Sequence, residues 1–476
     1  MSNILLINPH TPKFVKRRDK YIPHGLLYLA STLQRDGHQV QIIDANNDLL
    51  NLQQEKRESC IEYYYSQKFI SKLNAFKPDL VGIGGLFSGC FKASIFISRI
   101  IKKHYPDIPI VLGGIHPTMF PKEILKDYLY IDYIILGEGE VSFSKLIKSH
   151  FNDKKIIKDI GGIAFRENGK VTINPRTKFN DNLDDLPFPA YDLLNLKEYY
   201  MDTAHWHNPK NLPINIPLPI ISSRSCPYHC TFCSVFLMQG RGYRPRSPKN
   251  VVDEIEYLYK EYNHRYFSFM DDNFTLSKKR TLDICNEIIN RRLNIQFDTP
   301  NGISIKTLDK EVIDVLIQAG LIRTCIAIES GSEFIRNQVI QKGLPTQTIY
   351  DFFEMVEDYK DLHIKVFFII GYPQETKETL KETYEMIKRI PIEQVGIFFL
   401  ALYPGTTIFK YCQDNNLISY SPNNLHNIDT LYYYENDAPL IKPYQLKIED
   451  LIEFRKKAYD FINQRRAKLC LNPIEY

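Results

Sequence analysis

Three cysteines lie close together in one short stretch of the chain. Cys226, Cys230 and Cys233 are separated by three and then by two residues. Thiols at this spacing, in a chain whose other six cysteines are scattered, indicate metal or redox chemistry rather than a disulfide. A structural zinc site usually has four protein ligands, and no fourth Cys or paired His follows at zinc-finger spacing. His229 lies inside the run, but its ring cannot easily reach the same metal as its neighbour Cys230.

An iron–sulfur cluster is the other chemistry that fits this stretch. Such clusters are held by Cys thiolates, normally four. Three ligands leave one iron of a [4Fe–4S] cube open to a substrate or a cofactor. A zinc-binding loop and scattered buried thiols stay open as alternatives when the spacing is taken alone.

The Cys-x3-Cys-x2-Cys run, with the aromatic Phe232 before its last cysteine, resembles the signature of radical S-adenosylmethionine (SAM) enzymes. In that family the open iron binds the amino and carboxylate groups of SAM, and an electron from the cluster cleaves SAM to a 5′-deoxyadenosyl radical. The resemblance implies that Cys226, Cys230 and Cys233 hold a [4Fe–4S] cluster and that Phe232 contributes to the SAM site.

The composition excludes several classes of protein. A hydrophobic content of 44% and a charged content of 24% are typical of a soluble globular protein, and 476 residues predict roughly two to four domains. The net charge of +4, from 60 basic and 56 acidic residues, is too balanced to favour a nucleic-acid partner. The apolar runs are far shorter than the ~18 residues of a membrane span. Because the N-terminus also lacks a signal-peptide pattern, we expect a cytoplasmic protein.

In the N-terminal third, short apolar runs alternate with amphipathic stretches of helical period. This alternation predicts a parallel, doubly wound sheet. Several of its strands end in glycine-rich loops, where such sheets bind ligands because the backbone can approach closely. No Gly-x-Gly-x-x-Gly follows the first strand, so an ordinary dinucleotide site is not expected. The predicted strands span residues 4–7, 40–44, 79–85, 108–114 and 130–136.

Three segments of this region, residues 78–83, 113–118 and 137–140, resemble the cobalamin-binding domain fused to many radical SAM enzymes. The Asp-x-His-x-x-Gly run that supplies an axial histidine in cobalamin-dependent mutases is absent. His116 is therefore expected as a loop residue near the corrin, with cobalt ligation the less favoured role. The resemblance implies a cobalamin site formed by Gly84, Gly85, Ser88, Gly113, Gly114, His116, Gly137 and Glu138.

From residue 216 onward six strand-then-helix units can be counted. They predict an open partial (β/α)6 barrel with its site at the carboxyl ends of the strands. The cysteine loop leaves the first strand, at that same face. The predicted strands span residues 219–222, 266–270, 295–299, 324–328, 365–370 and 394–401.

The loops after the later strands could hold a nucleoside with an amino-acid tail, and they resemble the family's pattern over residues 220–415. Carboxylates after the second strand could bind an ammonium group, and a carboxylate after the fourth could accept bonds from ribose hydroxyls. Two departures stand out: Ser225 replaces a frequent glycine and Ser304 a frequent arginine. The implied SAM residues are Asp271, Asp272, Asn301, Glu329, Ser330, Gly371 and Tyr403, beside Phe232.

The sequence thus predicts an α/β protein with a cobalamin-binding domain (1–150), a connector (151–215), a radical SAM partial barrel (216–415) and a mainly helical C-terminal extension (416–476). The resemblance implies cobalamin-dependent methyl transfer to an unactivated carbon of a small-molecule or peptide substrate. It also implies a reductant such as flavodoxin or ferredoxin.

Other functions stay open at this point. Some relatives of the same pattern form rings or carry out oxidations or rearrangements without methyl transfer. Methylthio transfer to RNA is disfavoured, because that family carries three N-terminal cysteines and only Cys60 and Cys90 precede the motif here. A cobalamin- or metal-binding structural or sensor protein is the non-enzyme alternative.

Overall fold

A computed structural model describes residues 1–11, 21–53, 60–85, 88–151, 153–176, 178–199, 210, 212, 216–419 and 439–474. The chain forms two compact units. The first holds Met1–Asp202 together with the short segment Phe236–Gly240, and the second holds most of the remaining chain. Among the described helices, none combines the length and the apolar character that crossing a membrane requires.

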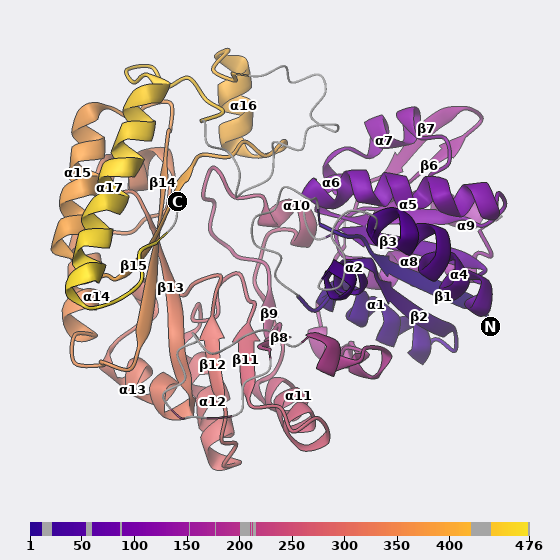
Figure 1. Cartoon of the computed structure of the whole chain (residues 1–476), viewed down its shortest axis with the longest axis horizontal. Helices are drawn as coiled ribbons and strands as arrows, with labels where there is room; N and C mark the ends of the chain where they lie inside the picture. The colour runs from indigo at the N-terminus through magenta and orange to yellow at the C-terminus, as the bar shows by residue number, and fades with distance from the viewer. Residues whose placement is uncertain are drawn as a thin grey trace. The chain divides into compact units, whose positions relative to one another are not determined.

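The first unit is built on a seven-stranded sheet in the order β2-β1-β3-β4-β5-β6-β7 (Figure 1). The first five strands pair in parallel, which confirms the predicted doubly wound sheet. The four apolar residues Ile4–Ile7 fill its centre with no exposure. The strands are β1 (Asn3–Asn8), β2 (Gln39–Asp44), β3 (Leu80–Gly85), β4 (Ile110–Gly114), β5 (Tyr133–Ile135), β6 (Ile163–Glu167) and β7 (Lys170–Asn174).

Strands β6 and β7 come from the segment that we expected to connect two domains. β6 pairs antiparallel with β5, and β7 pairs antiparallel with β6. A tight turn joins them, in which Asn168 and Gly169 both have positive φ, as hairpin turns of the primed types require. The two strands therefore extend the N-terminal sheet as an antiparallel hairpin.

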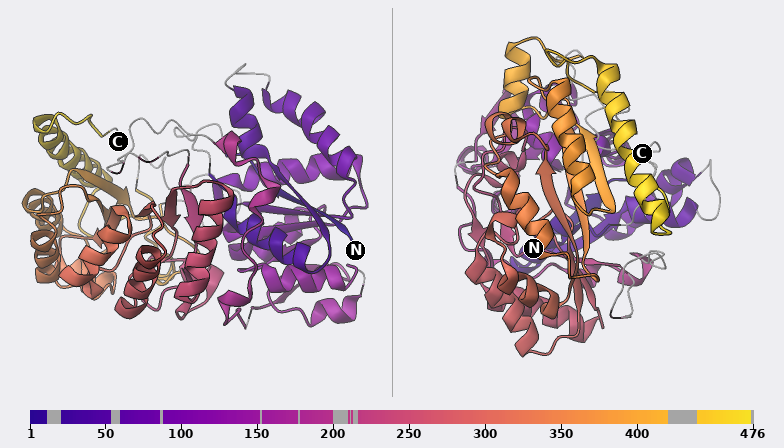
Figure 2. Two further views of the ribbon diagram at one scale, coloured as in Figure 1. Left: turned by 90° about the horizontal axis from the view of Figure 1, so that it is seen from below. Right: turned by 90° about the vertical axis from the view of Figure 1, so that its left-hand side faces the viewer.

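Helices cover both faces of this sheet (Figure 2). The apolar residues of α1 and α5 recur at helical spacing and turn into the core. The helices are α1 (His24–Arg35), α2 (Ala45–Gln53), α3 (Cys60–Tyr63), α4 (Ile70–Phe76), α5 (Phe91–His104), α6 (Ile115–Met119), α7 (Pro121–Asp127), α8 (Glu140–Lys148) and α9 (Lys154–Lys158), and a π-helical stretch spans Tyr64–Phe69.

The second unit contains a six-stranded sheet in which every pair is parallel and each strand lies beside its sequence neighbour. This order confirms the six predicted strand-then-helix units. A short antiparallel pair, β9 (Ser223–Arg224) with β10 (Arg244–Pro245), follows the first strand. The six strands are β8 (Leu218–Ile220), β11 (Tyr266–Phe269), β12 (Gln296–Thr299), β13 (Leu321–Glu329), β14 (His363–Ile370) and β15 (Gln394–Phe399).

Helices of this unit cover one side of the sheet, and in Figure 1 they run from the left of the unit to its lower edge. Several begin at a side chain that accepts a backbone N–H, as Ser247, Asp309 and Thr376 do. The helices are α11 (Pro248–Glu261), α12 (Lys278–Asn290), α13 (Lys310–Ala319), α14 (Thr346–Met355), α15 (Lys377–Arg389), α16 (Thr407–Asp414) and α17 (Ile448–Lys468). The short helix α10 (Val235–Gln239) follows the cysteine loop, and all but its first residue belong to the first unit.

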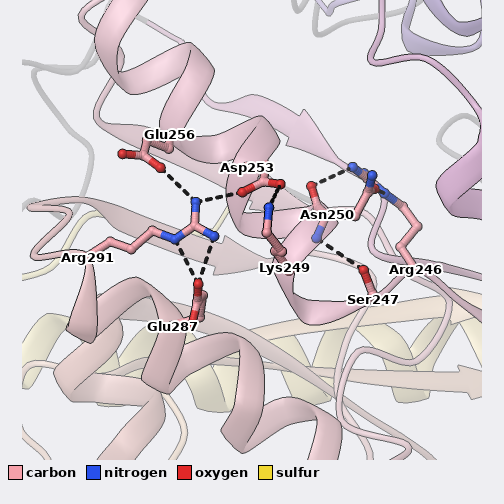
Figure 3. Close-up of polar contacts among 8 residues, drawn as sticks. All are labelled: Arg246, Ser247, Lys249, Asn250, Asp253, Glu256, Glu287 and Arg291. Atoms are coloured by element: carbon pink, nitrogen blue, oxygen red, sulfur yellow. Dashed lines mark hydrogen bonds and ion pairs between the residues drawn. The ribbon is translucent and has the colours of Figure 1, made fainter.

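A network of ion pairs joins α11 to α12 (Figure 3). Arg291 on α12 contacts Asp253 at 2.8 Å and Glu256 at 2.7 Å on α11, and it also contacts Glu287 on its own helix at 2.7 Å. Single surface pairs contribute little to stability, but several charges in one network contribute more. The network therefore holds α11 and α12, the two helices that follow the cysteine loop and α10, against each other.

Candidate active site

The three cysteines of the motif lie on the loop that leaves β8. All three thiols are free and partly exposed, and the Cys233 N–H donates to the Cys230 carbonyl at 3.1 Å. Burial raises the pKa of each thiol, that of Cys233 to about 12. The charges of Cys230 and Cys226 act on the Cys233 thiol in the same direction. Iron binding would displace their protons, so this donor set fits a thiolate-bound metal cluster.

The thiols do not form a site for one metal ion. In the part of the chain that the structure describes, no three His, Cys, Asp or Glu side chains converge closely enough to hold a single ion. This finding gives no support to a preformed zinc site. A cubane cluster places its thiolates on different irons, so its ligands stand farther apart than those of one zinc ion. The cluster therefore remains the prediction for this loop.

Asp271, at the carboxyl end of β11, holds the start of the cysteine loop. One carboxylate oxygen accepts from the Ser222 N–H at 2.7 Å, and the other accepts from the hydroxyls of Ser222 at 2.6 Å and Ser223 at 2.5 Å. The side chain is 1% exposed. Because both oxygens are used in this way, the geometry makes Asp271 a positioning residue. Its contact with SAM remains a prediction.

Two arginines donate hydrogen bonds to the backbone directly after β8, where the cysteine loop begins. Arg280 of α12 donates to the Ser222 carbonyl at 2.5 Å, and Arg246 donates to the Ile221 carbonyl at 2.9 Å. Arg246 also forms a buried ion pair with Glu254 of α11 at 2.5 Å. Charged hydrogen bonds to buried carbonyls are strong, so they hold the loop rigidly.

Thr231, between the second and third cysteines, anchors the middle of the loop. Its N–H donates to the Ile340 carbonyl and its hydroxyl to the Val339 carbonyl, each at 3.0 Å, and its own carbonyl accepts from the Ile408 N–H at 3.0 Å. Sequence reasoning missed Thr231, because its partners lie more than a hundred residues away. A polar residue in the middle of the motif was the only local signal.

Ser225 and Asp272 form a contact directly before the first cysteine. The Ser225 N–H donates to the Asp272 carboxylate at 3.1 Å. Ser225 has φ 67°, the left-handed conformation that glycine adopts without strain. This explains why glycine is frequent here in the family that the chain resembles. Burial and the neighbouring Asp271 raise the pKa of Asp272 to about 6.

Glu329, at the end of β13, lies beside the thiols and carries a cationic partner. Its carboxylate accepts from the Lys342 ammonium at 3.0 Å, and it is 5% exposed. Glu329 has φ 71°, a strained conformation of the kind that clusters at functional sites. Burial alone would lower the pKa of Lys342. The negative charges of Glu329, Cys230 and Cys233 have the larger effect, so the pKa of Lys342 is raised. Sequence reasoning missed Lys342, which no motif marked.

The other predicted SAM residues differ in their surroundings. Asn301 is exposed, and its amide donates to the Met270 carbonyl at 2.8 Å. Ser330 is 1% exposed, and its hydroxyl accepts from the Ser332 N–H at 3.2 Å. The Ser330 hydroxyl therefore stabilises its own loop, and a contact of Ser330 with SAM remains a prediction. The structure also places Phe232 partly exposed within the cysteine loop.

Gly371 and Tyr403 follow the last two strands. The Gly371 N–H donates to Glu375 at 2.5 Å, and its φ of 95° suits glycine. Glu375 is fully buried, also accepts from the Tyr372 N–H at 3.2 Å, and has a pKa raised by burial to about 7. The Tyr403 carbonyl accepts from the Thr406 hydroxyl at 2.7 Å, which starts α16. Both residues take part in hydrogen bonds within their own loops, and their contact with SAM remains a prediction.

In the first unit, four predicted glycines form one continuous edge. Gly84 pairs with Gly113 and Gly85 with Gly114 at the carboxyl ends of β3 and β4, and all four are partly exposed. A Cβ on Gly114 would lie 2.2 Å from the Gly85 carbonyl oxygen, whereas one on Gly113 would meet nothing within 4 Å. The four glycines carry no side chains of their own, but the Leu26 side chain lies 2.8 Å from where a Cβ on Gly84 would be, so the edge is open at Gly113. Its chemistry fits the face of a large planar ring such as a corrin.

Thr118 joins the two loops next to this edge. Its hydroxyl donates to the Gly114 carbonyl at 2.7 Å and accepts from the Gly137 N–H at 2.9 Å. Beyond it, Arg176 donates to the Leu136 carbonyl at 2.9 Å and also to the carbonyl of Glu138. The predicted Gly137 and Glu138 are therefore held beside the glycine edge. Ser88 is partly exposed in the 3-10 turn Ser88–Cys90 that follows β3.

The expectation that His116 lies in a loop is wrong. His116 lies in α6, where Pro117 is accepted because the first helical turn needs no N–H donor. The imidazole is 1% exposed, and its ring centroid lies 4.3 Å from that of Phe91 and 4.9 Å from that of Phe120. The ring is packed within the unit rather than presented at its surface.

Two family models match the chain. A model described as the radical SAM superfamily matches residues 220–387, and one described as the B12 binding domain matches residues 14–147. The two matches cover the units that carry the cysteine loop and the glycine edge.

Characterised and uncharacterised relatives match most of the chain. An uncharacterized methyltransferase of Pyrococcus horikoshii is 32% identical over 87% of this chain and 84% of its own length. The cytidylyl-2-hydroxyethylphosphonate methyltransferase of Streptomyces wedmorensis is 28% identical over 86% and 81%. The anaerobic magnesium-protoporphyrin IX monomethyl ester cyclase of Rubrivivax gelatinosus is 30% identical over 82% and 66%.

A solved structure shares the fold. The radical SAM methyltransferase TsrM from Kitasatospora setae, with cobalamin and a [4Fe–4S] cluster bound, superposes with a TM-score of 0.67 at 18% identity. The match covers 97% of this chain and 88% of that protein. The likeness extends over both units and shows the fold of the chain.

Proposed function

Because the chain belongs to the cobalamin-dependent radical SAM methyltransferase family, we propose that it transfers a methyl group to an unactivated carbon of a small-molecule or peptide substrate. One observation carries the proposal. The chain has a loop with three thiols, which leaves one corner of a cubane cluster open, and also a glycine edge, open at Gly113, that could support a corrin. Either feature alone would fit other chemistry, but the two together fit this reaction.

The residues of the chain contribute binding, orientation and shielding. When bound, the cluster supplies the electron that cleaves SAM, and cobalamin supplies the methyl group. Cys226, Cys230 and Cys233 would bind the cluster, with Asp271 and Thr231 fixing their loop. The partly exposed Asp272 and the buried Glu329 would accept hydrogen bonds from the polar groups of SAM.

For cobalamin we propose the glycine edge and the loop beside it as the binding residues, with a smaller role for His116 than the sequence suggested. Gly84, Gly85, Gly113 and Gly114 would support the ring, and the Gly137–Glu138 loop would border it. His116 would contribute through packing, because its ring lies between Phe91 and Phe120. The sequence also lacks the axial-histidine run of the mutases.

A reductant of the flavodoxin or ferredoxin class would deliver the electrons. Thiols of this kind need a reducing compartment, for which the cytoplasm is the natural proposal.

The test is anaerobic reconstitution with iron, sulfide and cobalamin, followed by incubation with SAM and a strong reductant. The enzyme should release 5′-deoxyadenosine, and Cys226→Ala, Cys230→Ala and Cys233→Ala should each lose both the cluster absorbance and this product. Cys470→Ala removes an exposed thiol outside the loop and should change neither. Equal product from the loop variants would refute the assignment.

A second function is favoured by one observation, the cyclase relative at 30% identity. A cyclase would use the same cofactors but would not add carbon. The mass of the product separates the two: a gain of one methyl group, dependent on cobalamin, supports methyl transfer, and a product without it supports the ring-forming reaction.

A further inference from the structure

Arg336 lies between Glu329 and Lys342, in the segment that follows β13, and its side chain has no exposure. The carboxylate with which it forms an ion pair, that of Glu333, lies at 3.6 Å and is 55% exposed, so this pair is weak. Taking a charged group out of water is costly unless hydrogen bonds replace the water. The guanidinium therefore depends on other acceptors within the fold.

Three neutral oxygens accept hydrogen bonds from this guanidinium. Nη1 donates to the Ser330 carbonyl at 2.5 Å, Nε to the Leu344 carbonyl at 2.6 Å and Nη2 to the Thr346 hydroxyl at 2.6 Å. Ser330 directly follows Glu329, whereas Leu344 lies two residues after Lys342. Because the donors of a guanidinium have a fixed planar arrangement, they define where the two loops lie relative to each other.

The backbone of Arg336 acts on the same two loops. Its carbonyl accepts from the Lys342 N–H at 3.0 Å, and its N–H donates to the Ser332 carbonyl at 2.9 Å. The turn that begins here is π-helical over Ile335–Val339, a form of helix that is frequent at functional sites. Both partners of the Glu329–Lys342 ion pair are therefore held through one residue.

The conformation of Glu329 requires such support. Its φ of 71° is strained for a residue with a side chain, and strained residues persist only where the surrounding structure holds them. The bond from the guanidinium to the Ser330 carbonyl holds the next residue in place. Because the Lys342 N–H is held as well, the carboxylate and the ammonium can meet at 3.0 Å.

The same segment also contacts the cysteine loop. The carbonyls of Val339 and Ile340, at the end of the π-helical turn, accept from the Thr231 hydroxyl and N–H at 3.0 Å each. The last carbonyls of a helix have no partner within the helix, so they are available for this contact. The segment 329–346 thus joins the Glu329–Lys342 pair to the loop that carries the cysteines.

We propose that Arg336 is a positioning residue for the SAM site: by joining the loop after β13 to the loop before α14, it holds the Glu329–Lys342 pair in the geometry that SAM binding uses. The SAM-binding consequence rests on the proposed function, whereas the positioning of the ion pair does not. Arg336 itself would touch neither SAM nor the cluster, because its side chain is fully buried.

The first test measures the coupling between Glu329 and Lys342 in the apoprotein. Urea unfolding of Glu329→Gln, Lys342→Met and the double variant gives the coupling energy as the departure from additivity. In an Arg336→Lys background the same cycle should give less than about half that value, because lysine keeps the charge but lacks the planar donors. A residue that only stabilises the fold would lower the stability of all four proteins equally. An unchanged coupling energy would therefore overturn the proposal.

Arg465→Lys is the matched control in the same unit. Arg465 of α17 also donates to backbone carbonyls, those of Ile390 at 2.7 Å and Lys388 at 2.8 Å. Burial lowers its pKa, as it lowers that of Arg336. Arg465→Lys should reduce stability and leave the coupling energy at the wild-type value. An equal fall in this control would overturn the assignment to Arg336.

Thr346→Val provides a second, milder variant, because it removes one of the three acceptors of the guanidinium. It should lower the coupling energy by a smaller amount than Arg336→Lys does. If Arg336→Lys does not fold, Thr346→Val decides the question, and an unchanged coupling energy there would overturn the proposal.

The second test measures SAM affinity in the reconstituted enzyme. Arg336→Lys should keep its iron but bind SAM about tenfold more weakly, whereas Arg465→Lys should bind SAM like the wild type. In a Lys342→Met background, Arg336→Lys should change SAM affinity by less than about twofold, because a residue that acts through the pair has little effect once the pair is gone. Equal SAM affinity in Arg336→Lys and Arg465→Lys would contradict the positioning role.

Failure of this proposal and failure of the proposed function can be told apart. A reduced coupling energy in Arg336→Lys, in a protein that releases no 5′-deoxyadenosine after reconstitution, would count against the proposed function alone. A methylated product from the wild type, with unchanged coupling energy and SAM affinity in Arg336→Lys, would count against the role of Arg336 alone.

Discussion

The ammonium of Lys342 lies 3.0 Å from the buried carboxylate of Glu329, and both act electrostatically on Cys230. The pair is one of the charged groups that act on the thiols of the cysteine loop. A cation beside thiolates stabilises their negative charge. Two consequences can be measured.

Lys342→Met should lower the free energy of unfolding by about 3 kcal/mol, because it leaves a buried carboxylate without its cation. The double variant with Glu329→Gln should recover most of this loss. Urea unfolding of the apoprotein measures both. The exposed pair Lys388–Glu385 supplies a control, since Lys388→Met should have a far smaller effect. A loss in Lys342→Met no larger than in this control would contradict the pairing.

In the reconstituted enzyme, Lys342→Met should also shift the cluster potential to a more negative value.

Asp271 and Asp272 are neighbours in sequence, but their substitution by alanine should affect different properties, iron content for Asp271 and SAM binding for Asp272. Asp271→Ala leaves the N–H of Ser222 and two hydroxyls without their acceptor, which should cost about 2 kcal/mol or more and reduce the iron content after reconstitution. Asp272→Ala removes one hydrogen bond and should keep its iron while binding SAM more weakly. Iron analysis and SAM titration distinguish the two. Full iron in Asp271→Ala would show that the loop does not depend on it.

The glycine edge can be tested with two neighbouring substitutions. Gly113→Ala places a methyl group in open space, so the protein should fold normally but lose cobalamin affinity about tenfold, because the ring can no longer lie flat. Gly114→Ala combines a positive φ with a clash against Gly85 and should destabilise by more than about 1 kcal/mol. Gly25→Ala, also in open space but on α1, is the control. Unchanged cobalamin binding in Gly113→Ala would place the corrin elsewhere.

Glu375 predicts a specific pH dependence of stability. Burial raises its folded pKa from 4.5 to about 7, so between these values the folded state binds the proton and the unfolded state does not. Stability should therefore fall as the pH rises from 4.5 to 7, by up to about 3 kcal/mol, and should level off above 7. Glu375→Gln should remove this slope. Urea unfolding of both proteins at several pH values is the measurement, and parallel curves would refute it.

Ser225 predicts a stabilising substitution inside the site. Its φ of 67° costs a non-glycine residue about 1–2 kcal/mol, and part of this is regained when glycine replaces it. Ser225→Gly should therefore raise the unfolding free energy by up to about 1 kcal/mol without loss of iron. Ser225→Ala keeps the backbone strain while removing the hydroxyl, so it separates the two contributions. A glycine variant less stable than the alanine variant would contradict the backbone argument.

Much of the architecture was predictable because it depends on local periodicity. The alternating apolar runs predicted both parallel sheets, and the cysteine spacing with its flanking motifs predicted the cofactors. Pairing between distant segments was not predictable in the same way. Strands β6 and β7 lie in the segment predicted as a connector, and nothing in their own sequence shows that β6 hydrogen-bonds to β5 and β7 to β6.

The same limit applies to the site. Motif reasoning gave Asp271 and Asp272 one shared role, but the turn after β11 directs one carboxylate to Ser222 and the other to Ser225. Lys342 and Thr231 act through partners brought near by the fold. His116 was predicted from its motif, whereas its burial depends on Phe91 and Phe120, which come from two other segments.

The hairpin formed by β6 and β7 also determines where the cobalamin-binding part can be cut out. The family match ends at residue 147, before the hairpin begins. A fragment ending there would uncover the hydrogen-bonding edge of β5, and a bare strand edge invites pairing with other molecules. Such a fragment should aggregate, whereas one extended past Asn174 keeps its own edge protection.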